Sequence, residues 1–141
     1  MTSNNLRGVT VSGDVEIIEP VQIEEGTVID ARDGKIIIEE GVVIGKHVHI
    51  TGGAAQKTVI GEKTVLGDNV RITMANIGAY STLGRNVSVD EASYTGDYAI
   101  LKEDTVLPKT AKVPSRAVAE GDPFSITRGL TAEELDEAER R

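Results

Sequence analysis

The chain has 141 residues, of which 39% are hydrophobic and only 3% aromatic, and its formal net charge is −8 at pH 7. This length fits a single domain, the negative charge opposes the phosphate contacts on which nucleic-acid binding depends, and the lack of cysteine excludes disulfides and thiolate metal sites. No apolar run is long enough to span a bilayer, and residues 1–7 contain no apolar stretch typical of a signal peptide. We therefore expect a cytoplasmic protein with no nucleic-acid partner and no membrane insertion.

A large aliphatic residue returns at every sixth position through most of the chain. The first half of this ladder reads Val11, Ile17, Ile23, Ile29, Ile38, Ile44 and Ile50. The second half reads Ile60, Leu66, Ile72, Ile77, Leu83, Val89, Thr95, Leu101, Leu107 and Val113. The fourth residue after a ladder position is usually small or β-branched. This period predicts a triangular solenoid, in which each hexapeptide supplies one strand and one corner and three hexapeptides complete one turn.

Two further features of the sequence agree with a solenoid. A β-sandwich usually needs large aromatic residues in its core, whereas a narrow interior of stacked aliphatic residues does not. Glycine often follows a ladder position directly, as at Gly61, and we expect these glycines to relax the backbone near the corners.

The six-residue period is interrupted in three places. Three extra residues lie within 29–38, four extra residues lie within 50–60, and one residue is missing within 72–77. Insertions in a solenoid usually leave the coil. We therefore predict surface loops around Asp33 and around Gly52.

The last part of the chain differs from the repeats. We divide the single domain 1–141 into a β-helix over 9–118, a connecting segment over 119–130 and a C-terminal helix over 131–141. Thr131 and Glu134 have the spacing of a capping box, and Leu130 and Leu135 occupy the positions of a hydrophobic staple. This helix is expected to cover strand edges of the solenoid.

The interruptions and the ending resemble those of the γ-class carbonic anhydrases, which share an early insertion, a later loop, a one-residue contraction and a closing Gly-x-Pro segment before a helix. The most specific matches are Thr58-Val59-Ile60-Gly61, and Gly121-Asp122-Pro123 followed by Arg128, Leu130 and Thr131. The resemblance spans roughly residues 9–135. It implies an all-β fold, a left-handed parallel β-helix with a short C-terminal helix, assembled as a homotrimer. The left-handedness follows from the resemblance, because the periodicity does not determine it.

Catalytic members of that family hold zinc at the subunit boundary with three histidines, two from one chain and one from its neighbour. By ladder position these histidines correspond to Thr51, Asp68 and Thr73, and the glutamine that helps to place the catalytic water corresponds to Gly45. A zinc ion would acidify a bound water for attack on carbon dioxide. Because all four positions have changed, we expect no cofactor, and the resemblance implies a member that has lost zinc-dependent hydration.

The family's subunit boundary also contains an ion pair, formed by the arginine of Arg-Gly-Asp and the aspartate of Asn-Ile-Gln-Asp. These motifs correspond here to Asp30-Ala31-Arg32 and Val43-Ile44-Gly45-Lys46. Asp30 and Lys46 therefore reverse both charges and remain opposite in sign. We predict that Asp30, Arg32 and Lys46 lie at a retained trimer interface. The alternative is a coincidence among the charged residues, which make up 27% of the chain.

His47 and His49 are the two histidines of the chain. As His-x-His on one strand, they are predicted to point to the same side, away from the interior. They are either ordinary polar residues of a surface or interface, or they form a displaced metal site together with Asp68.

Three functions follow from these observations. We favour a non-catalytic structural, binding or assembly role with a protein partner. The alternatives are a hexapeptide acyltransferase with His47 or His49 as the general base, and a carbonic anhydrase-type metalloenzyme with a displaced metal. The acidic side chains of the first turns would face a basic partner, or they keep the solenoid soluble. These are Glu16, Glu19, Glu24, Glu25, Glu39 and Glu40.

Overall fold

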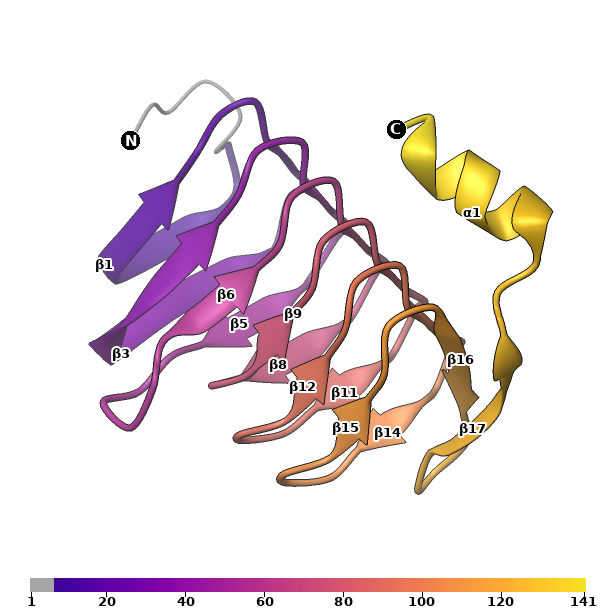
Figure 1. The fold of residues 1–141 in the computed structure, drawn as a ribbon. Helices are drawn as coiled ribbons and strands as arrows, with labels where there is room; N and C mark the ends of the chain where they lie inside the picture. The colour runs from indigo at the N-terminus through magenta and orange to yellow at the C-terminus, as the bar shows by residue number, and fades with distance from the viewer. Residues whose placement is uncertain (1–6) are drawn as a thin grey trace.

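The computed structural model describes residues 7–141, which form a β-solenoid with one helix beside its C-terminal end (Figure 1). The strands lie on three faces. β1 (Thr10–Ile17) and β3 (Val28–Ile38) each run from the first face onto the second, whereas later turns have separate short strands on these two faces. Within residues 7–141 the solenoid passes through six turns.

The shorter strands follow in order along each face. The first face continues with β5 (His49–Thr51), β8 (Arg71–Thr73), β11 (Ser88–Val89) and β14 (Val106–Leu107). The second face continues with β6 (Thr58–Ile60), β9 (Asn76–Ile77), β12 (Tyr94–Thr95) and β15 (Lys112–Val113). The third face contains β2 (Gln22–Ile23), β4 (Val43–Ile44), β7 (Val65–Leu66), β10 (Thr82–Leu83), β13 (Ile100–Leu101), β16 (Ala117–Glu120) and β17 (Ser125–Gly129).

The register of the strands places the ladder residues in line along the interior. On the first face, Ile29 pairs with Ile50, and Ile50 pairs with Ile72, all in parallel strands. These three side chains are completely buried. The predicted arrangement of three hexapeptides per turn is confirmed, because consecutive turns bring every third ladder position into register.

Buried hydroxyl groups join neighbouring turns at the corner between the second and third faces. The Thr64 hydroxyl donates to the Gly78 carbonyl at 2.7 Å, and the Ser81 hydroxyl donates to the Gly96 carbonyl at 2.9 Å. These residues are fully buried. Their hydroxyls satisfy carbonyl groups near the corner, so the small polar residues of the repeat cost little on burial.

Left-handed backbone recurs at the corners on residues other than glycine. Tyr80 and Tyr98 have φ angles of 59° and 58°, and Arg116 has 61°. Their N–H groups donate to carbonyls of the preceding turn, and the two tyrosine rings stack with centroids 5.1 Å apart. The Arg116 guanidinium lies 5.8 Å from the Tyr98 ring centroid. The corners are thus stabilised by contacts between turns, which offset the cost of this backbone conformation.

The glycines that follow the ladder positions have a different role from the predicted one. Gly61 does not have a positive φ, and a Cβ atom at this position would lie 2.6 Å from the backbone nitrogen of Ala79 in the next turn. The close approach of consecutive turns therefore excludes a side chain. The prediction that these glycines relax the corners is wrong in this respect.

The first insertion does not leave the solenoid as a separate loop. β3 continues through it as one strand, with an irregular register against β1 between Ser12 and Asp14. The second insertion lies beside it at the same corner, where a Cβ atom on Gly34 would come within 2.0 Å of the Gly53 carbonyl oxygen. The two insertions are accommodated by stacking on each other, which is why the predicted loop at Asp33 is wrong.

The C-terminal segment reverses direction after the last turn. β17 pairs antiparallel to β16, so residues 119–130, predicted without an element, contain a strand. α1 (Ala132–Glu139) follows, with Thr131 as its N-cap and with both hydrogen bonds of the predicted capping box to Glu134.

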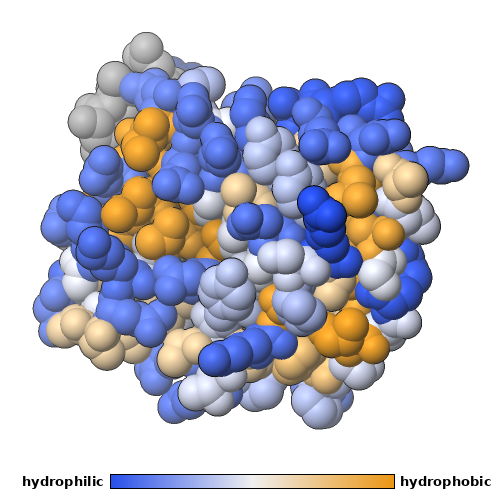
Figure 2. Space-filling view, viewed as in Figure 1, coloured by the Kyte–Doolittle hydropathy of each residue, from blue (hydrophilic) through white to orange (hydrophobic). Residues whose placement is uncertain are grey.

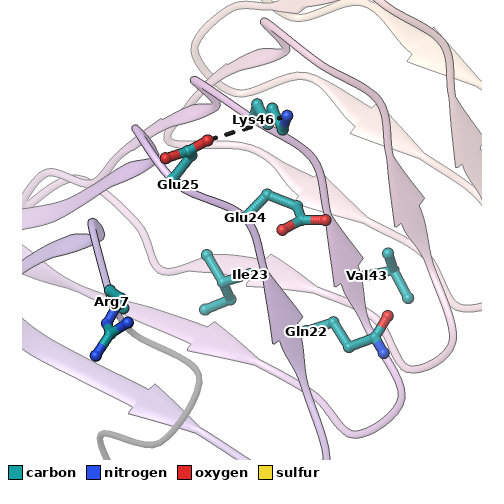
Figure 3. Close-up of a pocket in the computed structure, with 7 residues that line it drawn as sticks. All are labelled: Arg7, Gln22, Ile23, Glu24, Glu25, Val43 and Lys46. Atoms are coloured by element: carbon teal, nitrogen blue, oxygen red, sulfur yellow. Dashed lines mark ion pairs between the residues drawn. The ribbon is translucent and has the colours of Figure 1, made fainter.

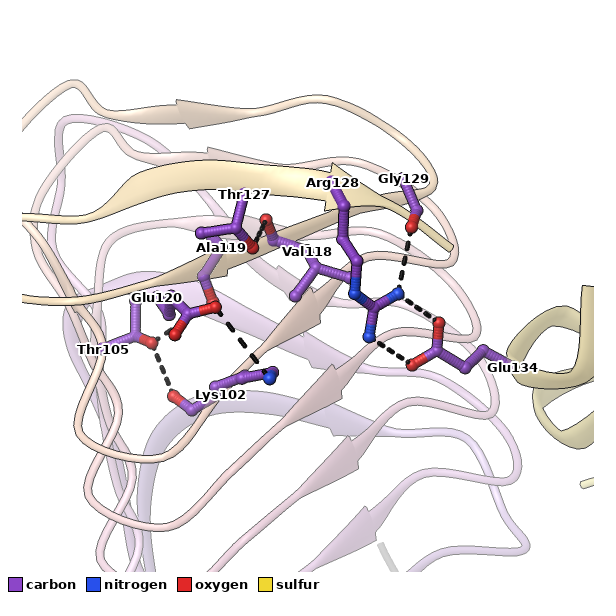
Figure 4. A network of polar contacts seen from close by, with 9 residues as sticks. All are labelled: Lys102, Thr105, Val118, Ala119, Glu120, Thr127, Arg128, Gly129 and Glu134. Atoms are coloured by element: carbon purple, nitrogen blue, oxygen red, sulfur yellow. Dashed lines mark hydrogen bonds and ion pairs between the residues drawn. The ribbon is translucent and has the colours of Figure 1, made fainter. Parts of the chain in front are cut away.

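Two arginines attach α1 to the solenoid. Near its first turn, the Arg128 guanidinium forms two hydrogen bonds to the Glu134 carboxylate, at 2.7 and 3.0 Å (Figure 4). After its last turn, Arg141 donates to the carbonyls of Lys63 and Ser81. Ala138 is the buried residue of α1. The helix is thus held mainly by polar contacts and lies alongside the turns (Figure 1).

Hydrophobic side chains also reach the surface of the solenoid. In Figure 2 one group of them lies over the N-terminal turns at the left of the view, and further groups lie at the right. Ile18 is 40% exposed, and Ile37 and Val59 are partly exposed on the outer side of the second face. Tyr94 lies farther along this face and is 46% exposed.

We expect Gly34→Ala to destabilise the fold by about 2 kcal/mol, because the added methyl group would collide with the backbone of Gly53. Urea unfolding followed by circular dichroism measures this loss. Gly129→Ala is the matched control, since the nearest atom to its added Cβ is 3.6 Å away. Equal stability of the two variants would contradict the stacking of the insertions.

The Arg128 guanidinium and the Thr131 N–H lower the pKa of Glu134 from 4.5 to about 2. Because the pKa is depressed in the folded state, the stabilisation is complete above pH 4.5 and is lost as the pH falls toward 2. We expect wild type to lose more stability than Glu134→Gln over this range, as measured by urea midpoints at each pH. If the stability of wild type and of Glu134→Gln changed equally with pH, the contact between Arg128 and Glu134 would not stabilise the attachment of α1.

Candidate functional site

The outer side of the first face carries a block of mainly polar side chains. Because the ladder residues point inward, their neighbours in β3, β5 and β8 point outward. His49 aligns with Arg71, and Thr51 aligns with Thr73, one turn apart. Asp30 aligns with Thr51 on the other side. We call His49, Thr51, Arg71 and Thr73 the first-face block.

His49 has the most restricted environment in the first-face block. Its side chain is partly buried, and its Nδ1 atom is shielded from solvent with no hydrogen-bond partner among residues 7–141 of this chain. β5 fixes its backbone through parallel pairing with β3 and β8. The backbone of His49 is therefore held in place, and one imidazole nitrogen is left unsatisfied within the described residues.

His47 does not share the strand of His49, and the prediction that it does is wrong. β5 begins at His49, whereas His47 lies at the preceding corner with a φ of 55° and is exposed. Its N–H donates to the Glu25 carbonyl, and its ring covers Gly26, where a Cβ atom would lie 2.2 Å from Nδ1. His47 therefore lies at a corner and His49 in a strand. The alternation of side chains along one strand, from which both were predicted to point to the same side, does not apply to this pair.

The positions that the resemblance assigns to the zinc histidines hold two threonines and an aspartate. Thr51 and Thr73 are neighbours, but hydroxyl groups are not among the usual zinc ligands. Asp68 accepts a hydrogen bond at 2.9 Å from the Lys46 N–H. Among the described residues of one chain, no group of three histidine, cysteine or acidic side chains is placed to hold a metal, including His47, His49 and Asp68.

The residues predicted at the subunit interface are on the surface of the single chain. Asp30 accepts hydrogen bonds from the Ser12 hydroxyl and the Arg32 N–H, at 3.1 and 3.0 Å, and its carboxylate lies 3.9 Å from the Arg32 guanidinium. Lys46 lies 4.0 Å from Glu25. These ion pairs are long and solvent-exposed, so they hold the side chains weakly within one chain.

A hollow of about 570 Å³ lies on the third face, over the first two turns (Figure 3). It is lined by Arg7, Gln22, Ile23, Glu24, Glu25, Val43 and Lys46. A second hollow of about 420 Å³ adjoins it and shares Gln22 and Val43. Together they form one groove across β2 and β4, which we call the third-face groove.

Sequence reasoning did not identify Arg71 or the third-face groove. Arg71 directly precedes a ladder residue, as His49 does, so aligning successive turns would have placed the two side chains together. The groove has no such signal in the sequence.

The fold agrees with solved structures of hexapeptide-repeat proteins. A hexapeptide transferase family protein from Anaplasma phagocytophilum matches with a TM-score of 0.73 and 22% identity, over 94% of this chain and 82% of that one. A putative acetyltransferase from Bacillus cereus matches with a TM-score of 0.78 and 19% identity, over 94% and 84% of the two chains. At these identities the agreement shows the fold, and the predicted left-handed parallel β-helix is confirmed.

A third similar structure contains ligands. It is PerB from Caulobacter crescentus, in complex with CoA and GDP-perosamine, with a TM-score of 0.76 and 20% identity. The match covers 85% of this chain and about half of that protein, 54% of its length. No protein-family model and no curated protein sequence matches the chain.

The α-helix in the described part of the chain is too short to span a bilayer, and no helix there meets the length and hydropathy of a membrane span.

Proposed function

We propose that the protein is an acyltransferase of the hexapeptide-solenoid class, which moves an acyl group from a thioester carrier to a hydroxyl or amine. The observation that carries this proposal is the partly buried imidazole of His49, which stands on the outer side of the first face on a strand paired on both sides. The solved relatives support it, since one is described as a hexapeptide transferase and another holds CoA beside an amino-sugar nucleotide.

His49 fits the role of general base better than His47 does. A general base needs a fixed position and partial shielding from water. His49 is partly buried, and its backbone is fixed in a strand that is paired on both sides. His47 is exposed at a corner and lacks this shielding.

The chemistry follows from the surroundings of His49. The imidazole takes the proton of the acceptor hydroxyl or amine as its oxygen or nitrogen attacks the thioester carbonyl. The carbon–sulfur bond then breaks, and the imidazolium returns the proton to the departing thiolate. The hydroxyl groups of Thr51 and Thr73 supply hydrogen bonds for the carbonyl oxygen, and Arg71 supplies a positive charge for phosphate groups of the carrier.

We expect His49→Gln to lower the rate of acetyl transfer from acetyl-CoA at least about 100-fold. Release of CoA is followed with a thiol-reactive dye, and the protein gives no background because it contains no cysteine. Amino sugars are the first acceptors to test, by analogy with the relative that binds GDP-perosamine.

His47→Asn is the control for this experiment, because asparagine tolerates the positive φ of that corner. It should leave the rate within about twofold of wild type, which is a far smaller change than the loss of about 100-fold expected when a general base is removed. Failure of acetyl-CoA to bind in calorimetry, or equal rates for wild type and His49→Gln, would rule out the proposal.

A second candidate is the non-catalytic assembly role of a carbonic anhydrase-like protein that has lost its zinc site. It is favoured by Thr51, Asp68 and Thr73, which stand where the resemblance places the zinc histidines, and by the reversed pair Asp30 and Lys46. A homotrimer would place Lys46 of one chain opposite Asp30 of the next. The trimer is common to both functions, since the acyl carrier of hexapeptide acyltransferases binds between subunits.

We expect Lys46→Glu to dissociate the trimer, because it would place two carboxylates together at each boundary. Light scattering gives the mass of the particle in solution. The double variant Asp30→Lys with Lys46→Asp restores opposite charges and should restore the trimer. A trimer that persists in Lys46→Glu would remove this pair from the interface.

A further inference from the structure

We propose that the outer side of the second face is a contact surface for a second copy of this chain, which packs on it around a two-fold axis with the two solenoids antiparallel. This contact lies apart from the proposed trimer boundary, because Asp30 belongs to the first face and Lys46 follows β4 on the third face. It does not depend on the proposed function.

One outward side chain from each turn forms a continuous column along the second face. In the turns of β3, β6, β9, β12 and β15, the outward residue is flanked by two buried residues and aligns with the outward residue of the next turn. In the first turn, Glu16 of β1 aligns with Ile37. The second-face column therefore reads Glu16, Ile37, Val59, Asn76, Tyr94 and Lys112. Its strands lie side by side in this order (Figure 1), and at about 4.8 Å per strand its ends are about 24 Å apart.

The middle of the second-face column is largely apolar and open to solvent. Tyr94 is 46% exposed, and Ile37 and Val59 are partly exposed. The Tyr94 ring has no stacked ring and no cation over it within residues 7–141, in contrast to Tyr80 and Tyr98. Single apolar side chains are ordinary on a protein surface, whereas three within four consecutive positions of one column form the kind of patch that contact surfaces use.

The two ends of the second-face column carry opposite charges. Lys112 is exposed and forms no ion pair within residues 7–141. Glu16 lies 3.6 Å from Lys35, which also lies 3.8 Å from Asp14. One lysine thus faces two carboxylates, which leaves this end of the column negative.

These charges select an antiparallel arrangement of two copies. When the first turn of one copy faces the sixth turn of the other, Glu16 meets Lys112 at both ends of the contact, and Ile37 meets Tyr94 twice, because a two-fold contact is reciprocal. A parallel arrangement would instead place Glu16 against Glu16 and Lys112 against Lys112. Like charges placed together in this way oppose association.

The centre of the contact places Val59 of one copy opposite Asn76 of the other. A hollow of about 360 Å³ lies beside these residues, over Gly61 and Gly78. Neither glycine has space for a Cβ atom, since the next turn lies too close. The hollow gives the Asn76 amide room to keep water as a hydrogen-bond partner, so it need not be buried unsatisfied.

The contact is expected to be weak. A single column with its flanks buries less than the roughly 800 Å² per partner of a standard stable interface, so we expect a dissociation constant on the order of 100 μM. At the corner toward the third face, Glu40 approaches Asp97 of the second copy, and the net charge of −8 on each chain opposes association further.

The test is sedimentation velocity of the full chain from about 5 to 500 μM, because a weak contact raises the mean mass with concentration by mass action. The mass at the lowest concentration, whether of a monomer or of the proposed trimer, is the baseline. The result for this contact is therefore distinguishable from the result for the trimer. We expect the mass of wild type to rise above the baseline over this range.

Two charge-reversed variants test the antiparallel arrangement. Glu16→Lys would place two lysines together at each end, and Lys112→Glu would place two glutamates together, so each variant alone should associate at least about tenfold more weakly. An equimolar mixture of the two brings opposite charges together at both ends and should associate within about twofold of wild type. Lys102→Glu is the matched control, because it makes the same change of charge on the third face and should behave as wild type.

A wild-type mass that stays at the baseline up to the highest concentration would overturn the proposal. So would a mixture that associates no better than its two components. Equal weakening by Lys102→Glu and Lys112→Glu would show that net charge governs the association and not the second-face column, and it would overturn the proposal as well.

Discussion

The hydrogen bonds between one turn and the next determine almost everything else in this protein. Each turn donates its backbone N–H groups to the carbonyls of a neighbouring turn, on the strands and at the corners alike. A single bond of this kind contributes about 1 kcal/mol, while each left-handed corner residue costs about 1–2 kcal/mol. One such bond alone does not offset this cost, and the corners are stabilised further by side-chain contacts between turns.

The same constraint explains which residues the repeat tolerates. Turns that are joined this closely leave no room for a Cβ atom at Gly61, and they bring Tyr80 and Tyr98 into a stack. They also bring distant residues together on the outer surface. His49 and Arg71 are twenty-two positions apart in sequence and neighbours in space, because one turn with its insertion separates them.

Much of the fold could be predicted from the sequence, since its signals are local or periodic. The buried ladder from Ile29 to Val113 and the capping box of Thr131 and Glu134 are of this kind. The continuity of β3 could not be predicted, because it depends on Gly34 meeting Gly53 in the next turn. β17 could not be predicted either, because it is antiparallel and lies outside the hexapeptide period.

The candidate site was harder to predict than the fold. The aligned motifs predict the loss of the zinc histidines at Thr51, Asp68 and Thr73, and this stays a prediction. The placement of His47 was wrong, because a positive φ on a residue other than glycine has no clear signature in a single sequence. The two histidines differ in burial and in backbone conformation, and this difference favours His49 as the base. It is known only once the structure shows that His47 lies at a corner.

The burial of the ladder also changes along the solenoid, and this affects how the protein opens. Val11 and Ile17 are only partly buried and Ile23 is 7% exposed, whereas the ladder residues of the middle turns are at most 2% exposed. In a structure where each turn contacts only its neighbours, unfolding proceeds from the end with the weakest contacts. The first turn, which contains β1 and β2, is thus expected to separate before the middle turns, so the solenoid opens from its N-terminal end.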